Sequence, residues 1–112
     1  MKRAIIFLAA LFALSTNVYA GVVQCSNLGI ERIVIQGDRV DDFVLENKLV
    51  ILLSSECSGY RYVYVNEGSS TYNAFLSMAL SAYAQKVDIG ININQGAVID
   101  SANQLASMWL QN

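Results

Sequence analysis

Four acidic side chains come closest to a reactive cluster in this sequence: Asp38, Asp41, Asp42 and Glu46. Paired carboxylates can transfer protons, and the carboxylates of Asp38-x-x-Asp41-Asp42 could also coordinate a calcium ion. That spacing does not match the twelve-residue calcium loop, so a solvated acidic turn is the favoured interpretation. The chain has no histidine, which excludes imidazole metal ligands and histidine-activated nucleophiles. We therefore predict a protein that is not an enzyme and has no catalytic residue, metal site or cofactor.

Three tyrosines alternate along one predicted strand. In the segment from Tyr60 to Val65, Tyr60, Tyr62 and Tyr64 share one face, and an arginine and two valines share the other. Tyrosine serves equally well in half-buried sheet packing and on a recognition surface, because its ring can pack while its hydroxyl stays wet. The three tyrosines are therefore candidate ligand-binding residues, with ordinary sheet packing as the alternative.

Residues 1–20 have the pattern of a secretory signal peptide. Two basic residues precede an apolar run from Ala4 to Leu14. In the segment Val18-Tyr19-Ala20, short side chains occupy the two positions that a signal peptidase recognises. A membrane anchor is the alternative, but the apolar run is too short to span a bilayer comfortably. We predict cleavage before Gly21. Residues 21–112 would then be one periplasmic or secreted domain without membrane insertion.

The sequence contains two cysteines, Cys25 and Cys57. Thiols of exported proteins are normally oxidised, so one intramolecular disulfide is the favoured interpretation. Two free thiols, or a bridge between chains, are the alternatives. A disulfide would remove both thiol nucleophiles and tie the N-terminal segment to the middle of the sheet. It would stabilise the domain by roughly 3 to 4 kcal/mol in the chain-entropy description.

A helix is predicted from Thr71 to Gln85, after hydroxyl residues that can accept free amide protons. Its apolar face comprises Tyr72, Phe75, Leu76, Ala79, Leu80 and Tyr83. The opposite stripe is small or weakly polar, and no residue of the helix is charged. This stripe either contacts another subunit or is the plain surface of a short helix in a charge-poor protein. Its candidate oligomer contacts are Asn73, Ser77 and Ser81.

Strands are predicted on both sides of this helix. The clearest alternation runs from Val87 to Asn94 and ends in a turn at Gln95-Gly96. β-Branched residues predict another strand from Leu28 to Gln36. The segment from Phe43 to Ser54 is either one long bent strand or two short strands with a tight turn at Asn47.

Two further segments are harder to assign from the sequence. Residues 54–59 read as a polar loop that holds Cys57. Near the end of the chain, Ala97 to Asp100 and Asn103 to Leu110 could form a final strand, whereas Ser101 with Gln104 resembles a helix capping box. We prefer the strand, because a sheet of this size needs a last strand to close.

The predicted order is strand, strand, strand, helix, strand, strand, which indicates a mainly β fold with one helix. It is the order of an OB-fold, a five-stranded and partly open barrel whose helix plugs one end. We therefore expect residues 21–112 to form a single OB-like domain.

One passage also resembles a known family. It comprises Ser70-Thr71-Tyr72-Asn73-Ala74-Phe75-Leu76, then Ala79-Leu80-Ser81-Ala82-Tyr83-Ala84, then Lys86-Val87-Asp88-Ile89. It is similar to the helix-to-strand passage of small secreted bacterial proteins related to the binding subunits of AB5 toxins, of the subtilase-cytotoxin and pertussis-like kind. The resemblance covers roughly the second half of the domain. It implies an OB-like subunit that forms a ring, with helices lining its centre, and that binds cell-surface glycans.

Two functions are compatible with these observations. The first is a secreted, non-enzymatic binding module that acts as an oligomer on a glycan. The second is a monomeric periplasmic protein that interacts with, or inhibits, another exported protein. Nucleic-acid binding is not expected, because the formal net charge is −2 and no basic stripe is present to follow a phosphate backbone.

Overall fold

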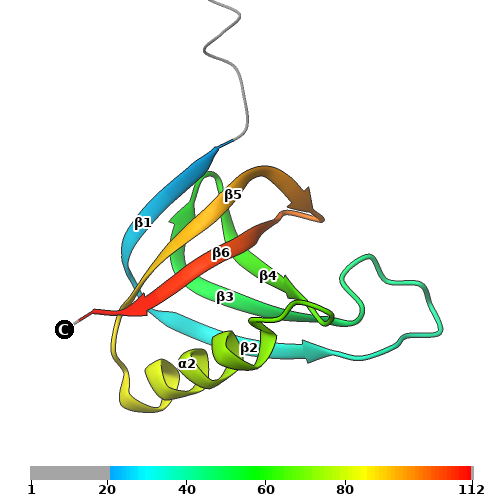
Figure 1. The fold of residues 1–112 in the computed structure, drawn as a ribbon, viewed down its shortest axis with the longest axis horizontal. Coiled ribbons are helices and arrows are strands. Elements are labelled where there is room, and N and C mark those ends of the chain that lie inside the picture. Colours follow the sequence, from blue (N-terminus) through cyan, green and yellow to red (C-terminus); the bar gives the residue numbers. More distant parts are fainter. Residues whose placement is uncertain (1–20, 112) are drawn as a thin grey trace, which may run out of the picture.

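The computed structural model describes residues 21–111, so the predicted signal peptide lies outside the described residues. In this part of the chain, six strands and one helix form a mainly β fold, as expected (Figure 1). Their order is β1 (Val22–Leu28), β2 (Ile30–Gln36), β3 (Lys48–Cys57), β4 (Tyr60–Asn66), α2 (Tyr72–Gln85), β5 (Ile89–Ile99) and β6 (Ala102–Leu110). Within residues 21–111, no helix is both long and apolar enough to cross a membrane.

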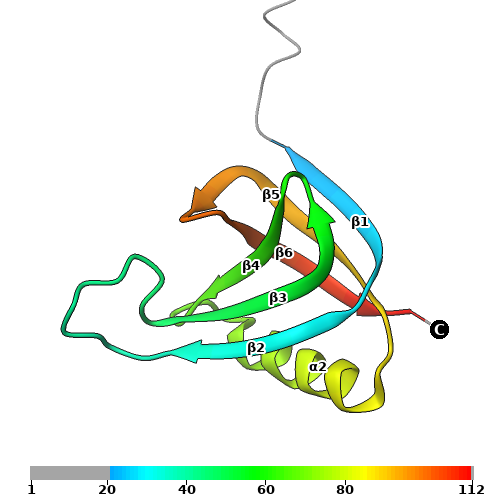
Figure 2. The same cartoon turned by 180° about the vertical axis from the view of Figure 1, so that it is seen from behind.

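The strands form one mixed sheet in the order β1-β5-β6-β4-β3-β2. In this sheet, β4 and β6 pair in parallel, and the other four pairs of neighbouring strands are antiparallel. The two end strands, β1 and β2, are consecutive in the chain and separated by Gly29 alone, so the sheet must curve strongly (Figures 1 and 2). The Gly29 N–H donates to Ser54 Oγ over 2.9 Å, and the Ser54 N–H donates to the Gly29 carbonyl over 2.8 Å. These bonds hold the bend against β3.

The number of strands differs from the expected five. The predicted strand from Leu28 to Gln36 is interrupted at Gly29, and only its part from Ile30 onward is β2. The strand β1, which pairs with β5, was not predicted. Its sequence mixes valines with Gln24, Ser26 and Asn27, so neither its periodicity nor its composition separates it from a loop.

The main core lies on the face of the sheet that α2 covers. Ile89, Ile91 and Ile93 are fully buried there, as their alternation predicts. The helix approaches through Ala79 and Ala82, whose small side chains allow close packing. The predicted apolar face of the helix is wrong at its edge, because Leu80 and Tyr83 are each 51% exposed.

The Cys25–Cys57 disulfide is confirmed, with a Cα–Cα distance of 5.8 Å. It joins β1 to the end of β3, rather than to the middle of the sheet. The buried side chain of Asn103 donates a hydrogen bond from Nδ2 to the Cys57 carbonyl over 2.8 Å. This bond satisfies the amide in the core and connects the disulfide to β6.

Residues 37–47 form a loop, so the prediction of strand from Phe43 is wrong. Asn47 makes the expected tight turn, with a φ of 56°, and β3 begins directly after it. β3 then continues through Cys57, which reduces the predicted polar loop to a turn at Ser58 and Gly59. Phe43 and Leu45 resemble strand residues in the sequence because they are apolar, but they pack against the sheet as part of this loop.

The C-terminal hairpin also differs in detail. β5 continues through Gln95 and Gly96 to Ile99, so the predicted turn there is wrong. The ladder with β6 is irregular between Asn94 and Val98, which accommodates these residues as a bulge. The chain reverses at Asp100 and Ser101, and the last segment is strand, so the helix alternative is wrong.

Candidate ligand-binding groove

A groove lies on the face of β2, β3 and β4 that points away from the core. Its volume is about 410 Å³. We call it the outer groove, and it is lined by Arg32, Val34, Gln36, Phe43, Leu45, Val50, Tyr62 and Asp100. The strands provide its floor, and the loop of residues 37–47 and the β5–β6 turn provide its rim. These segments are far apart in the chain and meet because the sheet curves.

The pairing of the strands explains how the walls of the outer groove meet. Arg32 on β2 lies opposite Leu52 on β3, and Leu52 lies opposite Tyr62 on β4. Side chains in one row across a sheet share a face, so Arg32 and Tyr62 both project outward. Arg32 Nη2 donates to the Tyr62 hydroxyl oxygen over 3.0 Å. A cation and an aromatic ring are thereby held together in the outer groove.

The three predicted tyrosines have different environments. Tyr60 lies at the β3–β4 turn, is 37% exposed and does not line the outer groove. Tyr62 lines it. Tyr64 is only 3% exposed, donates its hydroxyl proton to the Ala97 carbonyl over 3.1 Å, and has a pKa raised by burial. One of the three is therefore placed to touch a ligand, and Tyr64 packs beneath the site.

A second apolar cluster supports the floor of the groove. Its buried members are Leu45, Val50, Tyr64 and Ala102. Phe43 and Tyr62 pack against this cluster while remaining partly exposed. Because their inner edges are fixed by packing, the two rings present defined surfaces to the groove.

The loop that carries Phe43 is held by Arg39. The Arg39 guanidinium lies 4.4 Å from the centre of the Phe43 ring and donates to both carboxylate oxygens of Asp41, over 3.0 and 2.7 Å. It also donates to Gln36 on β2 over 3.3 Å, and the Arg39 N–H donates to a carboxylate oxygen of Glu46 over 3.0 Å. The loop thus closes on itself and onto β2, which orders one rim of the groove.

Of the four acidic residues in this segment, Asp41 and Glu46 take part in this closure, and the four do not form one cluster. The hydrogen bond from Arg39 holds the pKa of Asp41 below its ordinary value, and the raised pKa of Arg39 has the same cause. Among residues 21–111, no three acidic, cysteine or histidine side chains gather as metal ligands would. Asp100, at the β5–β6 turn, is the acidic residue on the opposite rim of the outer groove.

The composition of the outer groove suits reversible binding. Aliphatic side chains form the floor, two aromatic rings form the walls, and Arg32, Gln36 and Asp100 provide charged and amide groups. Ligand sites commonly combine a mostly apolar lining with a few polar groups that fix orientation. A molecule with both a flat apolar face and a polar edge would satisfy both kinds of group.

The predicted oligomer contacts lie elsewhere, on α2. Asn73 and Ser77 are exposed, and Ser81 is half-buried. Ser81 Oγ accepts a hydrogen bond from Gln85 Nε2 over 3.1 Å. None of the three lines the outer groove. The structure therefore separates the helix stripe from the tyrosine site.

The sequence did not identify Arg32, Phe43 or Asp100 as site residues. Arg32 reads as one polar residue of an imperfect strand, Phe43 as the start of another strand, and Asp100 as part of a final strand. Only the cross-strand register and the position of the loop bring them to one groove. Comparisons of the chain with protein-family models, curated proteins and solved structures find no match.

Proposed function

We propose that this chain is an exported, non-enzymatic module that binds a glycan in the outer groove. The observation that carries the proposal is the Arg32–Tyr62 pair beside Phe43, on an apolar floor, with Asp100 on the facing rim. A sugar ring has an apolar C–H face, which stacks on the electron-rich face of an aromatic ring. Its hydroxyl groups both donate and accept hydrogen bonds, which suits Arg32, Gln36 and Asp100 together.

The size of the groove is consistent with such a ligand. Its volume of about 410 Å³ falls in the range of roughly 300–1,000 Å³ that is usual for small-molecule sites. The groove is partly open to solvent, so a glycan attached to a larger carrier could enter by its terminal residues. The ordered loop would reduce the entropy lost on binding.

The topology supports an OB-like barrel as the scaffold. If β1 and β2 are counted as two halves of one strand bent at Gly29, five strands remain and the helix follows the third. OB-folds bind oligosaccharides and oligonucleotides on the face of strands two and three, between two loops. Here these strands correspond to β3 and β4, and the loops to residues 37–47 and the Asp100–Ser101 turn. The outer groove occupies that face.

The helix supports an oligomeric form of the module. The exposed positions of α2 include Asn73, Ser77, Leu80 and Tyr83, and the helix carries no charge. An uncharged helix with exposed apolar side chains is more stable when it is buried against another subunit than when it is exposed to solvent. We propose a ring, similar to that of AB5 toxin binding subunits, with α2 at the subunit contacts. Light scattering should then give about five times the chain mass.

The proposal of export rests on the signal-peptide pattern together with the Cys25–Cys57 disulfide. Disulfides persist in oxidising compartments such as the periplasm and the extracellular space.

A monomeric protein-interaction module is the second candidate. The observation that favours it is the tip of the loop of residues 37–47, where Val40 is fully exposed and Val44 is 56% exposed. Exposed apolar side chains on an ordered loop suit an apolar pocket of a protein partner. A stable complex that is lost in Val40→Ser and Val44→Ser variants, with no glycan binding, would favour this candidate.

The experiment uses the oxidised protein, residues 21–112, on a glycan array, followed by titration of the bound glycans. Tyr62→Ala removes a groove wall, and Tyr60→Ala is the matched control on the same strand, outside the groove. We expect Tyr62→Ala to lose at least about tenfold in affinity, as a central aromatic contact does, and Tyr60→Ala to bind as the parent does. Equal binding by all three proteins, or no glycan bound at all, would contradict the proposal.

A further inference from the structure

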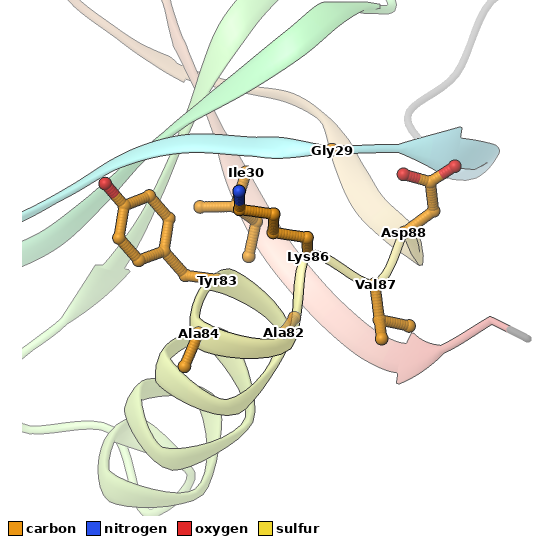
Figure 3. Close-up of a pocket in the computed structure, with 8 residues that line it drawn as sticks. All are labelled: Gly29, Ile30, Ala82, Tyr83, Ala84, Lys86, Val87 and Asp88. Atoms are coloured by element: carbon orange, nitrogen blue, oxygen red, sulfur yellow. The ribbon is translucent and has the colours of Figure 1, made fainter.

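A second pocket lies where α2 ends, beside the bend between β1 and β2 (Figure 3). Its volume is about 530 Å³. We call it the helix-end pocket, and it is lined by Gly29, Ile30, Ala82, Tyr83, Ala84, Lys86, Val87 and Asp88. It shares no lining residue with the outer groove. A ligand could therefore occupy it independently of the proposed glycan site.

The pocket carries two opposite charges without partners among the described residues. Lys86 and Asp88 make no salt bridge, and neither side chain has a hydrogen bond within residues 21–111. The other cationic side chains in that range all have partners: Arg32 with Tyr62, Arg39 with Asp41, Lys48 with the Glu46 carbonyl, and Arg61 with Glu31. Lys86 thus differs from them in having its ammonium group free beside a pocket.

The backbone at Lys86 adds a second argument. Lys86 ends the helix with φ 56° and ψ 42°, a left-handed conformation that glycine adopts at lower cost than lysine. The cap itself is made by the Lys86 N–H, which donates toward the Ala82 and Tyr83 carbonyls. A glycine would make the same cap. The lysine side chain is therefore not required for the cap itself, and its ammonium group places a positive charge both at the negative end of the helix dipole and beside the pocket.

Gly29 lines the same pocket near Asp88, and its lack of a side chain leaves space there. A Cβ at this position would lie 3.7 Å from Asp88 Oδ1 and 3.5 Å from Ser54 Oγ. A longer side chain would crowd the Asp88 carboxylate. Figure 3 shows Gly29 on the ribbon near Asp88 and the Lys86 side chain extending from the end of the helix, with Ile30 and Tyr83 also lining the pocket. The pocket lining thus combines the two charged groups with an aromatic ring and an aliphatic side chain.

We infer that the helix-end pocket binds a small zwitterion of the amino-acid type. Its carboxylate would pair with the Lys86 ammonium, its ammonium with the Asp88 carboxylate, and its apolar side chain would pack on Tyr83 and Ile30. A simple anion would be attracted by Lys86 but repelled by Asp88. A simple cation would be attracted by Asp88 but repelled by Lys86. A molecule with both charges satisfies both groups, and this property goes beyond the proposed glycan binding.

The test is a titration of ¹⁵N-labelled, oxidised protein with leucine, followed by amide chemical shifts. N-acetyl-leucine, which lacks the ammonium, and leucinamide, which lacks the carboxylate, are the matched ligands. We expect leucine to shift amides at residues 29–30 and 82–88 and to bind about two- to fivefold more tightly than either analogue. Equal binding of the three compounds, or no shifts with leucine at millimolar concentration, would overturn the inference.

Two variants separate binding from folding. Lys86→Gly removes the charge while easing the left-handed backbone, so we expect an intact fold and leucine binding weakened about two- to fivefold. Asp88→Asn should weaken it similarly, whereas Glu67→Gln, an exposed acid away from the pocket, should have no effect. Unchanged leucine binding by Lys86→Gly would also overturn the inference. Because Tyr62→Ala leaves this pocket intact, failure of glycan binding and failure of zwitterion binding are distinguishable.

Discussion

The guanidinium of Arg32 and the phenol oxygen of Tyr62 lie 3.0 Å apart, joined by a hydrogen bond that spans the neighbouring strand β3. The two residues are 30 positions apart in the chain and meet because each is in register with Leu52. The bond sets the direction of the guanidinium relative to the aromatic ring. A ligand in the outer groove would therefore meet a preorganised pair and not two independent side chains.

Removing this hydrogen bond should affect binding more than stability. Tyr62→Phe keeps the ring but leaves Arg32 without its acceptor. The pair is exposed, so we expect a change below about 1 kcal/mol in the free energy of unfolding. Affinity for a bound glycan should fall about three- to tenfold, measured by isothermal titration calorimetry. Full parental affinity in Tyr62→Phe would show that only the ring matters.

The loop of residues 37–47 should lose order when Arg39 is replaced. Arg39→Gln removes the contacts with Asp41 and with the Phe43 ring. We expect faster hydrogen exchange at amides 38–46 and weaker ligand binding, with little change in the rest of the sheet. Arg61→Gln, whose contacts with the Leu53 carbonyl and Glu31 lie outside the loop, is the control. Unchanged exchange in Arg39→Gln would mean that the backbone alone orders the loop.

The same contact predicts a pH dependence. Because the hydrogen bond from Arg39 lowers the pKa of Asp41 in the folded state, the contact is present above the ordinary value of 3.8 and is lost as pH falls through the lower folded pKa. Carboxyl chemical shifts should place the Asp41 midpoint below 3.8 in the parent. In Arg39→Gln the midpoint should move upward, and an unchanged midpoint would contradict the assigned cause.

Gly90 should not accept a side chain. It lies opposite Trp109 in the β5–β6 ladder, and a Cβ at Gly90 would overlap the indole ring. Gly90→Ala should therefore lower the free energy of unfolding by about 1–3 kcal/mol, because the indole or the strand must shift. Urea denaturation measures this change. Gly68→Ala, where a Cβ meets no atom within 4 Å, is the control. Equal stability of the two variants would contradict the packing described here.

Loss of the disulfide should lower stability substantially. Cys25 and Cys57 are separated by 32 positions, and closing a loop of that length stabilises the folded state by about 3–4 kcal/mol in the chain-entropy description. Denaturation of the oxidised protein and of a Cys25→Ala, Cys57→Ala double variant measures the difference. A difference below about 1 kcal/mol would mean that the unfolded chain is already compact without the bridge.

Local patterns predicted the elements that bury one face in a regular way. The isoleucines at 89, 91 and 93 and the small-residue helix from Tyr72 onward were correctly identified. β1 was missed because its mixed composition and irregular periodicity do not distinguish it from a loop. Phe43 was assigned to a strand because its neighbours Val44 and Leu45 are also apolar, and periodicity cannot distinguish a loop packed on a sheet from a strand within it.

The candidate site was predicted only at Tyr62. The alternation of the tyrosines places all three on one face, but it does not reveal that Tyr64 is covered by the neighbouring hairpin through its bond to Ala97. Arg32 and Asp100 come from segments whose proximity depends on strand register and on the position of a turn. These are relations between distant parts of the chain, and no pattern within one segment contains them.

The most direct test of glycan binding in the outer groove is an NMR titration of the ¹⁵N-labelled, oxidised protein with a glycan selected from the array. We predict that the largest amide shifts fall at Arg32, Phe43, Tyr62 and Asp100, with small shifts along α2. Shifts concentrated on the helix, or at the helix-end pocket, with none in the outer groove, would contradict the account.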